Sequence, residues 1–387
     1  MSRIDDLIAE YCPDGVKHQT LGEIGEFIRG NGIQKRDFQD SGFGCIHYGQ
    51  IYTYYGLFAD HTKSFIDPNL AEKRKKAYKG DLVIATTSEN EEDVCKACAW
   101  LGEEPIAISG DAYIFRHHQN PKYISYCFQS ELFQSQKKKY ITGTKVLRVN
   151  GDAMAKIHVP VPPLPVQEEI VRILDSFSSL EAELEAELEA RRKQYTHYRD
   201  ELLKFEREIL IASLGELCKI SVGRKNGTAG EFGEYPYVNA GTSMSGFVNE
   251  WSEEGDCVTT PSRGQGGMGF VAYQASRFWC GPLCYVMRSK HSDVMIKYVY
   301  YYLCSHKADI LGLVHEGGTP AINKSELAGL RILVPPFEEQ QRIVSILDRF
   351  DKLTNDLSSG LPAEIEARHK QYEYYRDRLL SFDELAA

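Results

Sequence analysis

The sequence predicts an α+β protein in which two mixed α/β domains alternate with two long helices. One long segment occurs twice, near residues 161–205 and again near residues 334–382. Its apolar residues recur at steps of three and four, the spacing of one face of a helix. The regions between the copies contain short apolar runs and many glycines, and they share little sequence with each other. Two similar helices between two dissimilar domains indicate an internal pseudo-two-fold symmetry.

The two copies of the repeat match residue by residue. Both contain the pattern Gln-x-x-Ile-Val-x-Ile-Leu-Asp-x-Phe, which runs over residues 167–177 and 340–350. Both end in Lys-Gln-Tyr-x-x-Tyr-Arg-Asp-x-Leu-Leu, over residues 193–203 and 370–380. At ~1.5 Å per residue each helix would be about 60 Å long, more than one small domain can cover. We therefore expect the copies to pair with each other as an antiparallel coiled coil.

The ends of these helices are also marked. Each copy follows a double proline, Pro162-Pro163 or Pro335-Pro336, which ends a domain and allows a helix to start. The second copy contains Ser358-Ser359-Gly360-Leu361-Pro362, which should kink or break its helix. The expected domain boundaries are 1–165, 166–208, 209–336 and 337–387.

The first copy contains tetrads of Leu-Glu-Ala-Glu from Leu180 to Ala190. A four-residue period drifts slowly around a helix of 3.6 residues per turn, so a tetrad can be added without breaking the apolar face. Each tetrad lengthens a helix by ~6 Å. The tetrads predict an adjustable spacer between the two domains. The alternative interpretation of the glutamates is an acidic helix face exposed to solvent.

Composition narrows the class of protein. No run of about 18 apolar residues and no signal-peptide pattern occurs, so neither a membrane nor export is expected. The 10 cysteines suit a reducing cytoplasm. The net charge of −10 comes mainly from the repeated helices, and the domains between them are nearly neutral. A neutral domain can still present a basic face, so the charge permits DNA binding without indicating it.

The double-proline segments, the Gln-x-x-Ile-Val run, the Lys-Gln-Tyr ending and the Leu-Glu-Ala-Glu tetrads resemble the specificity subunit of type I restriction–modification systems. The resemblance implies two target-recognition domains, each reading one half of a split site in double-stranded DNA. It also implies docking of modification (methyltransferase) subunits, of which we expect two, and of restriction (translocase and nuclease) subunits. Catalysis would then belong to the partners, which would use S-adenosylmethionine, ATP and Mg²⁺, with no cofactor or metal in this chain.

The two domains share faint internal similarities despite their different sequences. Leu21-Gly22-Glu23-Ile24 returns as Leu214-Gly215-Glu216-Leu217, and Gly80-Asp81 returns as Gly255-Asp256 before a short apolar run. Polar loops follow each of these marks and could contact bases or phosphates. The candidate DNA-binding residues of the first domain are Arg29, Asn31, Gln34, Lys35, Arg36, Thr87, Ser88 and Asn90. Those of the second domain are Arg224, Lys225, Asn226, Ser262, Arg263 and Gln265.

The matched polar residues of the helices suggest a second, repeated contact, because pairing of two helices needs only the apolar face. We therefore expect these residues to bind the modification subunits. The candidates are Gln194, Tyr195, Tyr198, Arg199 and Asp200 with their copies Gln371, Tyr372, Tyr375, Arg376 and Asp377.

A catalytic role is the alternative to DNA recognition. The chain has no Gly-x-x-x-x-Gly-Lys-Ser/Thr motif, and neither double proline belongs to the Asn/Asp-Pro-Pro-aromatic motif of amino-methyltransferases. Cys95-Lys96-Ala97-Cys98 could join a zinc site, but buried thiols are the default interpretation. A self-contained methyltransferase or nuclease, and a coiled-coil adaptor whose domains bind proteins, remain the alternative functions.

Overall fold

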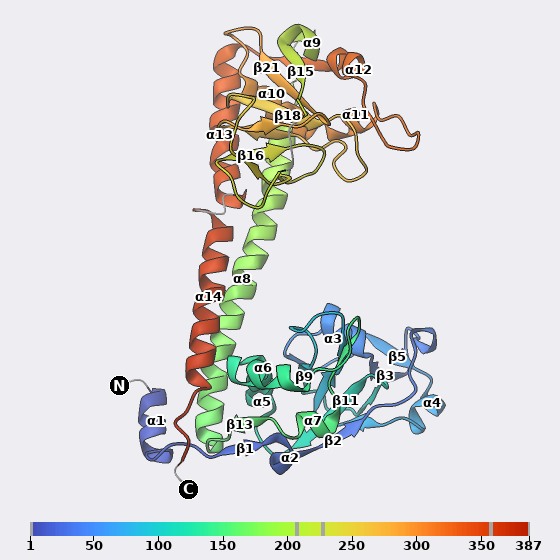
Figure 1. The fold of residues 1–387 in the computed structure, drawn as a ribbon, viewed down its shortest axis with the longest axis vertical. Helices are drawn as coiled ribbons and strands as arrows, with labels where there is room; N and C mark the ends of the chain where they lie inside the picture. The colour runs from blue at the N-terminus through green and yellow to red at the C-terminus, as the bar shows by residue number, and fades with distance from the viewer. Residues whose placement is uncertain (1–2, 206–208, 226–228, 356–358, 386–387) are drawn as a thin grey trace. The chain divides into compact units, whose positions relative to one another are not determined.

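The computed structural model describes residues 3–205, 209–225, 229–355 and 359–385 (Figure 1). The chain divides into two compact units. The first unit comprises Met1–Glu183 and Glu366–Ala387, and the second comprises Leu184–Ile365. Each unit contains one α/β part, which we call its head, together with parts of the long helices.

The first head is built on a five-stranded sheet of order β2-β11-β7-β9-β4. Its strands are β2 Gly25–Arg29, β4 Phe58–Ala59, β7 Leu82–Ala85, β9 Lys96–Trp100 and β11 Ala112–His117. A second sheet of order β5-β3-β10-β6 contains β3 Phe43–Ile46, β5 Ser64–Ile66, β6 Lys76–Ala77 and β10 Ile106–Ile108. Two short ladders pair β1 His18–Thr20 with β13 His158–Pro160, and β8 Thr87–Ser88 with β12 Leu147–Arg148.

The second head repeats this plan with fewer strands. Its main sheet has the order β15-β21-β18-β19, formed by β15 Cys218–Val222, β18 Cys257–Pro261, β19 Ala272–Gln274 and β21 Cys284–Ser289. A smaller sheet contains β16 Tyr235–Val238, β17 Phe247–Val248 and β20 Trp279–Cys280. The strand β14 Leu210–Ser213 pairs with β22 Arg331–Val334. In chain order and in sheet order, β15, β18, β19 and β21 therefore correspond to β2, β7, β9 and β11.

Short helices complete both heads. The first unit contains α1 Arg3–Tyr11, α2 Leu21–Ile24, α3 Tyr48–Thr53, α4 Pro68–Glu72, α5 Pro121–Gln129, α6 Glu131–Lys137 and α7 Gly151–Met154, with 3-10 turns at Lys35–Asp37 and Lys138–Tyr140. The second contains α9 Leu214–Leu217, α10 Ile296–Ser305, α11 Lys307–Leu311 and α12 Lys324–Gly329. The two Leu-Gly-Glu segments form α2 and α9, and each begins with a capping box from Thr20 or Ser213.

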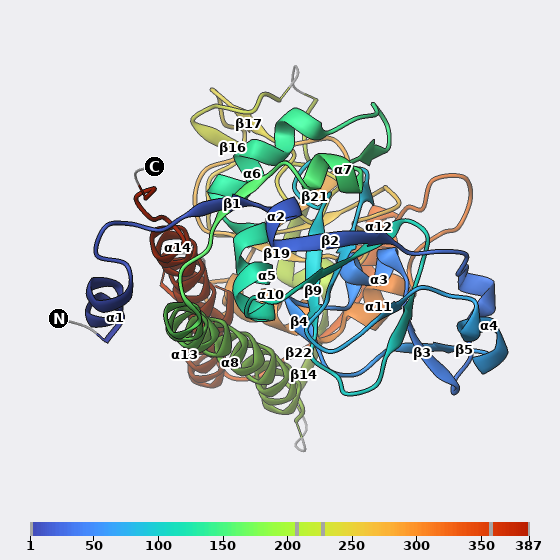
Figure 2. The ribbon, with the colours of Figure 1, turned by 90° about the horizontal axis from the view of Figure 1, so that it is seen from below.

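The repeated segments are long helices, as predicted. The first copy is one continuous helix, α8 Leu164–Leu202, of 39 residues. The second copy is divided into α13 Phe337–Asn355 and α14 Leu361–Leu379, so the predicted break is present, although Ser358 lies outside the described residues. Within the first unit, α14 runs antiparallel beside the N-terminal part of α8 (Figures 1 and 2). Within the second unit, α13 runs antiparallel to the C-terminal part of α8.

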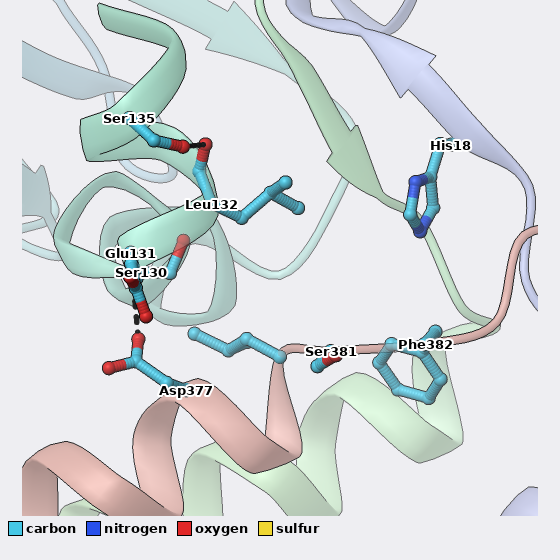
Figure 3. Close-up of a pocket in the computed structure, with 9 residues that line it drawn as sticks. His18, Ser130, Glu131, Leu132, Ser135, Asp377, Ser381 and Phe382 are labelled. Atoms are coloured by element: carbon cyan, nitrogen blue, oxygen red, sulfur yellow. Dashed lines mark hydrogen bonds between the residues drawn. The ribbon is translucent and has the colours of Figure 1, made fainter.

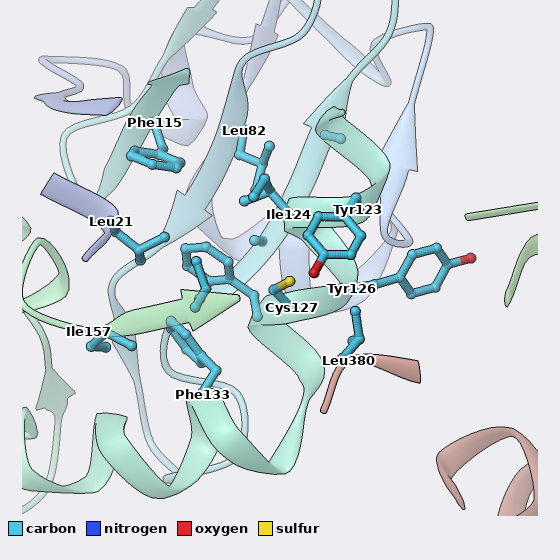
Figure 4. Close-up of a cluster of buried hydrophobic side chains, with 14 of the residues drawn as sticks. Leu21, Leu82, Phe115, Tyr123, Ile124, Tyr126, Cys127, Phe133, Ile157 and Leu380 are labelled. Atoms are coloured by element: carbon cyan, nitrogen blue, oxygen red, sulfur yellow. The ribbon is translucent and has the colours of Figure 1, made fainter. Parts of the chain in front are cut away.

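The core of the first head shows why its central strand is a continuous apolar run. All four residues of β7, Leu82–Ala85, are fully buried. Leu82 and Ile84 face one hydrophobic cluster, drawn in part in Figure 4, while Val83 and Ala85 face another. A strand covered on both faces needs no polar residue. The larger cluster also contains Val166 and Ile170 of α8, so the long helix is part of the core of the head.

Candidate nucleic-acid interface

The two candidate loops of each head lie at one edge of its main sheet. In the first head, β2 and β7 are both antiparallel to β11, and Arg29 and Ile84 both pair with Tyr113. Both strands therefore end at the same edge, where the loops after Arg29 and Ala85 begin. This long-range pairing brings together loops that are separate in the sequence.

The second head places its loops in the same way. Val222 of β15 and Thr260 of β18 both pair with Tyr285 of β21. The loops that begin at Gly223 and Ser262 therefore leave the sheet at corresponding positions. The correspondence inferred from the Leu-Gly-Glu and Gly-Asp marks is thus present in the strand pairing of both heads.

A polar hollow of about 270 Å³ lies at this edge of the first head. Two of the predicted residues, Arg29 and Thr87, line it. The guanidinium of Arg29 is held by one bond, from Nε to the carbonyl oxygen of Gly110 at 3.1 Å. Its terminal nitrogens have no hydrogen-bond partner among the described residues, so they are available to a ligand. The full lining is Arg29, Thr86, Thr87, Asp111, Tyr113, Thr142, Arg148, Val149 and Asn150.

Two predicted amides of the first head already have internal partners. Asn31 donates from Nδ2 to the carbonyl of Lys73 at 3.2 Å and accepts from the backbone N–H of Lys75 at 2.8 Å. Asn90 donates from Nδ2 to Asp93 and accepts from the N–H of that residue, both at 2.8 Å. Ser88 accepts from the N–H of Asn90 at 3.3 Å. These three side chains hold their own loops, and contact with a base would require them to exchange those bonds.

The remaining predicted residues of the first head are more accessible. Gln34 is the N-cap of the 3-10 turn that contains Lys35 and Arg36, and all three residues are exposed. In the part of the chain that the structure describes, the side chains of Lys35 and Arg36 have no ion-pair partner. They therefore suit contact with phosphate, which needs a mobile positive charge more than a fixed geometry.

In the second head, Arg224, Lys225, Arg263 and Gln265 are exposed and Ser262 is half-buried. Asn226 lies outside the described residues. The backbone carbonyl of Arg224 accepts from the indole Nε1 of Trp279 at 3.1 Å, which fixes the start of its loop and leaves the guanidinium outward. Arg263 pairs with Ala321 in an isolated β-bridge. The structure therefore brings the described candidates of this head to one sheet edge.

A third loop at each edge was not selected from the sequence. In the first head, Thr142 and Arg148 exchange backbone bonds of 2.9 and 2.8 Å and close an exposed loop around Gly143, whose φ is +96°. In the second head, His315 and Ala321 close the corresponding loop around Gly318, whose φ is +72°. The recurring Gly-Thr dipeptides at 143–144 and 318–319 were the available signal. They mark the turn but do not show that it reaches the same edge.

The repeated helix residues attach each head to its helix pair. In the first unit, the carboxylate of Asp175 accepts from Lys122 Nζ at 2.6 Å and from the Tyr126 hydroxyl at 2.8 Å. The amide of Gln167 accepts from the N–H of Asn120 at 3.0 Å and donates to the carbonyl of Pro162 at 2.7 Å. These bonds join α8 to the start of α5.

The second unit repeats these bonds with the second copy. Asp348 accepts from Lys297 Nζ at 2.7 Å and from the Tyr301 hydroxyl at 2.6 Å. Gln340 accepts from the N–H of Met295 at 2.9 Å and donates to the carbonyl of Pro335 at 2.9 Å. We call the four residues Gln167, Asp175, Gln340 and Asp348 the helix anchors. Their partners on α10 correspond to those on α5.

The described residues contain no cluster of His, Cys, Asp and Glu side chains that could hold a metal ion. Cys95 and Cys98 are both buried, and burial raises the pKa of each thiol to about 12. Such thiols are protonated at neutral pH, as expected for buried cysteines. Among the described residues, no helix combines the length and apolar character needed to span a bilayer.

Comparison with known proteins identifies the family. Residues 13–190 and 208–367 match the family described as "Type I restriction modification DNA specificity domain". The chain belongs to this family. Each matching region contains one of the two heads described above, so the chain carries two specificity domains.

Individual relatives agree with this assignment. The chain is 36% identical over 273 residues to the specificity subunit of a type I restriction enzyme from Escherichia coli, a match that covers 60% of this chain and 65% of that protein. The match thus spans slightly less than two thirds of that relative. A putative type I specificity subunit of Mycoplasma pneumoniae is 34% identical over 244 residues, covering 59% of this chain and 94% of that protein.

Two solved structures share the fold. The type I restriction–modification S subunit from M. genitalium superposes with a TM-score of 0.60 at 15% identity, covering 94% of this chain and 96% of that chain. A chain from a study of assembly and conformational transition of the type I R-M system gives a TM-score of 0.60 at 17% identity, covering 95% and 98%.

Several helix residues predicted to bind partners have contacts inside their own unit. Tyr195 and Tyr372 are buried, and Arg199 and Arg376 lie near these rings with 15% and 12% of their side chains exposed. Asp377 accepts from the N–H of Glu131 at 2.9 Å, beside the cleft drawn in Figure 3. Asp200 accepts from the hydroxyl of Ser305 at 2.7 Å.

These internal contacts give a structural reason for the repeat in this chain. Gln194 and Gln371 bond Arg191 and Arg368 of the same helix, at 2.9 and 3.1 Å. Tyr198 stacks on Phe350 but is 44% exposed, and its copy Tyr375 stacks on Phe177. Binding of modification subunits by these residues stays a prediction.

Proposed function

We propose that the chain is the non-catalytic specificity subunit of a type I restriction–modification complex. In this proposal each head reads one half of a split site in double-stranded DNA. The observation that carries it is the pair of corresponding sheet edges, which have the same strand pairing but different loop residues. One strand arrangement used twice with different loop side chains is suited to reading two different short sequences.

The edges suit DNA for reasons of shape and chemistry. Arginine, threonine and amide side chains at strand ends can donate to and accept from base edges in a groove. Exposed cations such as Lys35 and Lys225 can contact the flanking phosphates. The division between base readers and phosphate contacts would give each half-site its own sequence while both heads bind DNA in the same way.

We further propose that two modification subunits and the restriction subunits bind this chain and use S-adenosylmethionine, ATP and Mg²⁺. The chain itself would use no cofactor. Modification subunits would dock near the two copies of the helix ending, where Tyr198 and Tyr374 are 44% and 60% exposed. Because Arg199 and Arg376 bond Asp200 and Asp377 within their own units, reversing these charges tests docking only if the variant also keeps its thermal stability.

The test is to produce the full chain with its modification subunit in a host lacking other adenine methylation, and to map methylated adenines. The proposal predicts one motif with two fixed half-sites around an unread spacer. Methylation or cleavage by the purified chain alone would instead support a self-contained enzyme. Failure of the assembled complex to bind a random pool of duplexes would support a protein-binding adaptor.

A further inference from the structure

The loop-bearing sheet edges of the two heads can be compared position by position, because equivalent backbone hydrogen bonds occur in both. In the first head, the N–H of Thr86 donates to the carbonyl of Asp111 at 3.2 Å, and the N–H of Val149 donates to the carbonyl of Thr86 at 3.2 Å. One ladder position further, Thr87 pairs with Arg148.

The same bonds recur in the second head. The N–H of Ser262 donates to the carbonyl of Leu283 at 2.9 Å, and the N–H of Ile322 donates to the carbonyl of Ser262 at 3.0 Å. Arg263 then pairs with Ala321. These equivalent backbone bonds form a common frame and show which residues of the two heads occupy corresponding positions.

Some positions keep the same residue type in both heads. Tyr113 of the first head lies between β2 and β7, and Tyr285 of the second head lies between β15 and β18. Asn150 and Asn323 follow the corresponding Val149 and Ile322 and are the N-caps of α7 and α12. These residues belong to the frame and cannot distinguish one half-site from the other.

The charged residues of the hollow are not kept. Two cations and one carboxylate of the first head are all replaced by apolar residues in the second. The replacements, in order, are Arg29 by Val222, Asp111 by Leu283 and Arg148 by Ala321.

Most charged groups of the hollow have no bonded partner within the head. Among the described residues, neither the guanidinium of Arg148 nor the carboxylate of Asp111 has a hydrogen-bond or ion-pair partner. Arg29 uses only its Nε, so its terminal nitrogens are also available. Unpaired charges facing one hollow indicate a ligand with complementary groups.

The mixture of charges indicates which part of DNA lies there. A phosphate offers only acceptors, and the carboxylate of Asp111 would repel it. A G·C pair offers two acceptors on guanine, O6 and N7, beside a donor on cytosine, the N4 amino group. Arginine is the commonest partner of the guanine edge, and aspartate can accept from the cytosine amine. A hollow with free guanidinium groups and a free carboxylate matches this pattern.

We propose that Arg29, Arg148 and Asp111 read a G·C base pair in the half-site bound by the first head. The arginines donate to guanine O6 and N7, and Asp111 accepts from cytosine N4. The second head, with Val222, Leu283 and Ala321 in these places, cannot read a G·C pair by the same contacts. This inference rests on the proposed function, because it assumes that each head binds one half-site.

The first test needs no substitution in the hollow. Methylation mapping of the wild-type complex must show a fixed G·C pair in the half-site of the first head, which is identified by exchanging that head. Binding to a duplex with 7-deazaguanine at this position should fall roughly 10-fold, because one guanine acceptor is lost. A split site whose first half has no fixed G·C pair would overturn the inference and leave the proposed function intact.

The second test uses variants of the full chain in complex with its modification subunit. Arg148→Gln and Asp111→Asn should relax the sequence at this single position, with roughly 10- to 100-fold loss of discrimination. Neither should alter the other half-site. Lys63→Gln is the matched control, since it removes one exposed positive charge from the same head outside the hollow.

Salt dependence separates base reading from phosphate contact. The slope of log affinity against log salt should be the same for wild type and Arg148→Gln. A slope that falls by about 1 in the variant, with the methylated motif unchanged, would assign Arg148 to a phosphate and refute the proposal. If no variant changes any position of the motif, the hollow is not a reading site.

Discussion

The two heads attach to their helices through the same bonds, yet they differ at the sheet edge that carries the loops. Gln167 and Gln340, like Asp175 and Asp348, meet corresponding partners at nearly equal distances. At the sheet edges, by contrast, the positions of arginine and aspartate in the first head are occupied by valine, leucine and alanine in the second. The difference separates residues that hold the frame from residues free to vary with the DNA sequence.

Exchange of the first head is expected to have the largest effect. Replacing residues 25–155 by the corresponding head of another specificity subunit should change one half-site completely and leave the other intact. The physical reason is that each edge is formed within its own unit. Methylation mapping gives the readout. A change in both half-sites, or in neither, would show that the heads are not independent readers.

The helix anchors provide a test of the shared frame. Gln340→Leu and Gln167→Leu should each lower the free energy of unfolding by about 2–4 kcal/mol, because buried backbone groups lose their partners. Both side chains are at most 1% exposed. Urea denaturation of the full chain measures the effect. Gln341→Leu, the same substitution at the exposed neighbour, should change stability by less than about 0.5 kcal/mol. Unequal losses of stability in Gln167→Leu and Gln340→Leu would mean that the two heads are not attached to their helices in the same way.

Acid should distinguish the heads. His117 ends β11, whereas Ser289 ends the corresponding β21. Burial lowers the pKa of His117 from 6.5 to about 4, so the folded head keeps this imidazole neutral while the unfolded chain binds a proton. Stability is therefore lost as the pH falls below 6.5, by about 1.4 kcal/mol per unit, and the loss levels off near pH 4.

Hydrogen exchange at pH 7 and pH 5 should show this acid effect locally. Peptides from β2 and β11 should lose protection at the lower pH relative to peptides from β15 and β21. His117→Gln should reduce the difference between the heads, and the remainder is expected from His47, whose pKa is also lowered by burial. Equal loss in both heads of the wild type would rule out His117 as its origin.

The tetrads of α8 should have the smallest and most specific effect. Insertion of Leu-Glu-Ala-Glu after Glu187 lengthens the helix by ~6 Å, whereas DNA rises ~3.4 Å per base pair. We expect the unread spacer to grow by one to two base pairs while both half-sites stay the same. An active complex with an unchanged spacer would leave these tetrads as a solvated acidic helix face.

Local pattern was enough to predict the helices and the place where the second copy breaks. Repetition also located the loops, because Gly80-Asp81 and Gly255-Asp256 precede corresponding strands. The partners of Asn31 and Asn90 could not be predicted, since nothing in a sequence shows whether an amide is already bonded to a nearby loop.

The other gaps have the same physical origin. Arg148 and Asp111 were not selected because strand pairing, rather than spacing, brings them to the edge beside Thr87. The internal partner of Asp200 could not be predicted either, because Ser305, whose hydroxyl donates to Asp200, is far away in the sequence. Contacts across long sequence separations are therefore what single-sequence reasoning lacked.

Photo-crosslinking tests most directly whether corresponding edges read different half-sites. Thr87 and Arg263 occupy the same place in the two frames, so each is replaced in turn by p-benzoylphenylalanine in the full chain bound to its modification subunit. On the methylated motif, the Thr87 position should crosslink only to one half-site and the Arg263 position only to the other. Crosslinks from both positions to the same half-site, or to the spacer, would contradict the account.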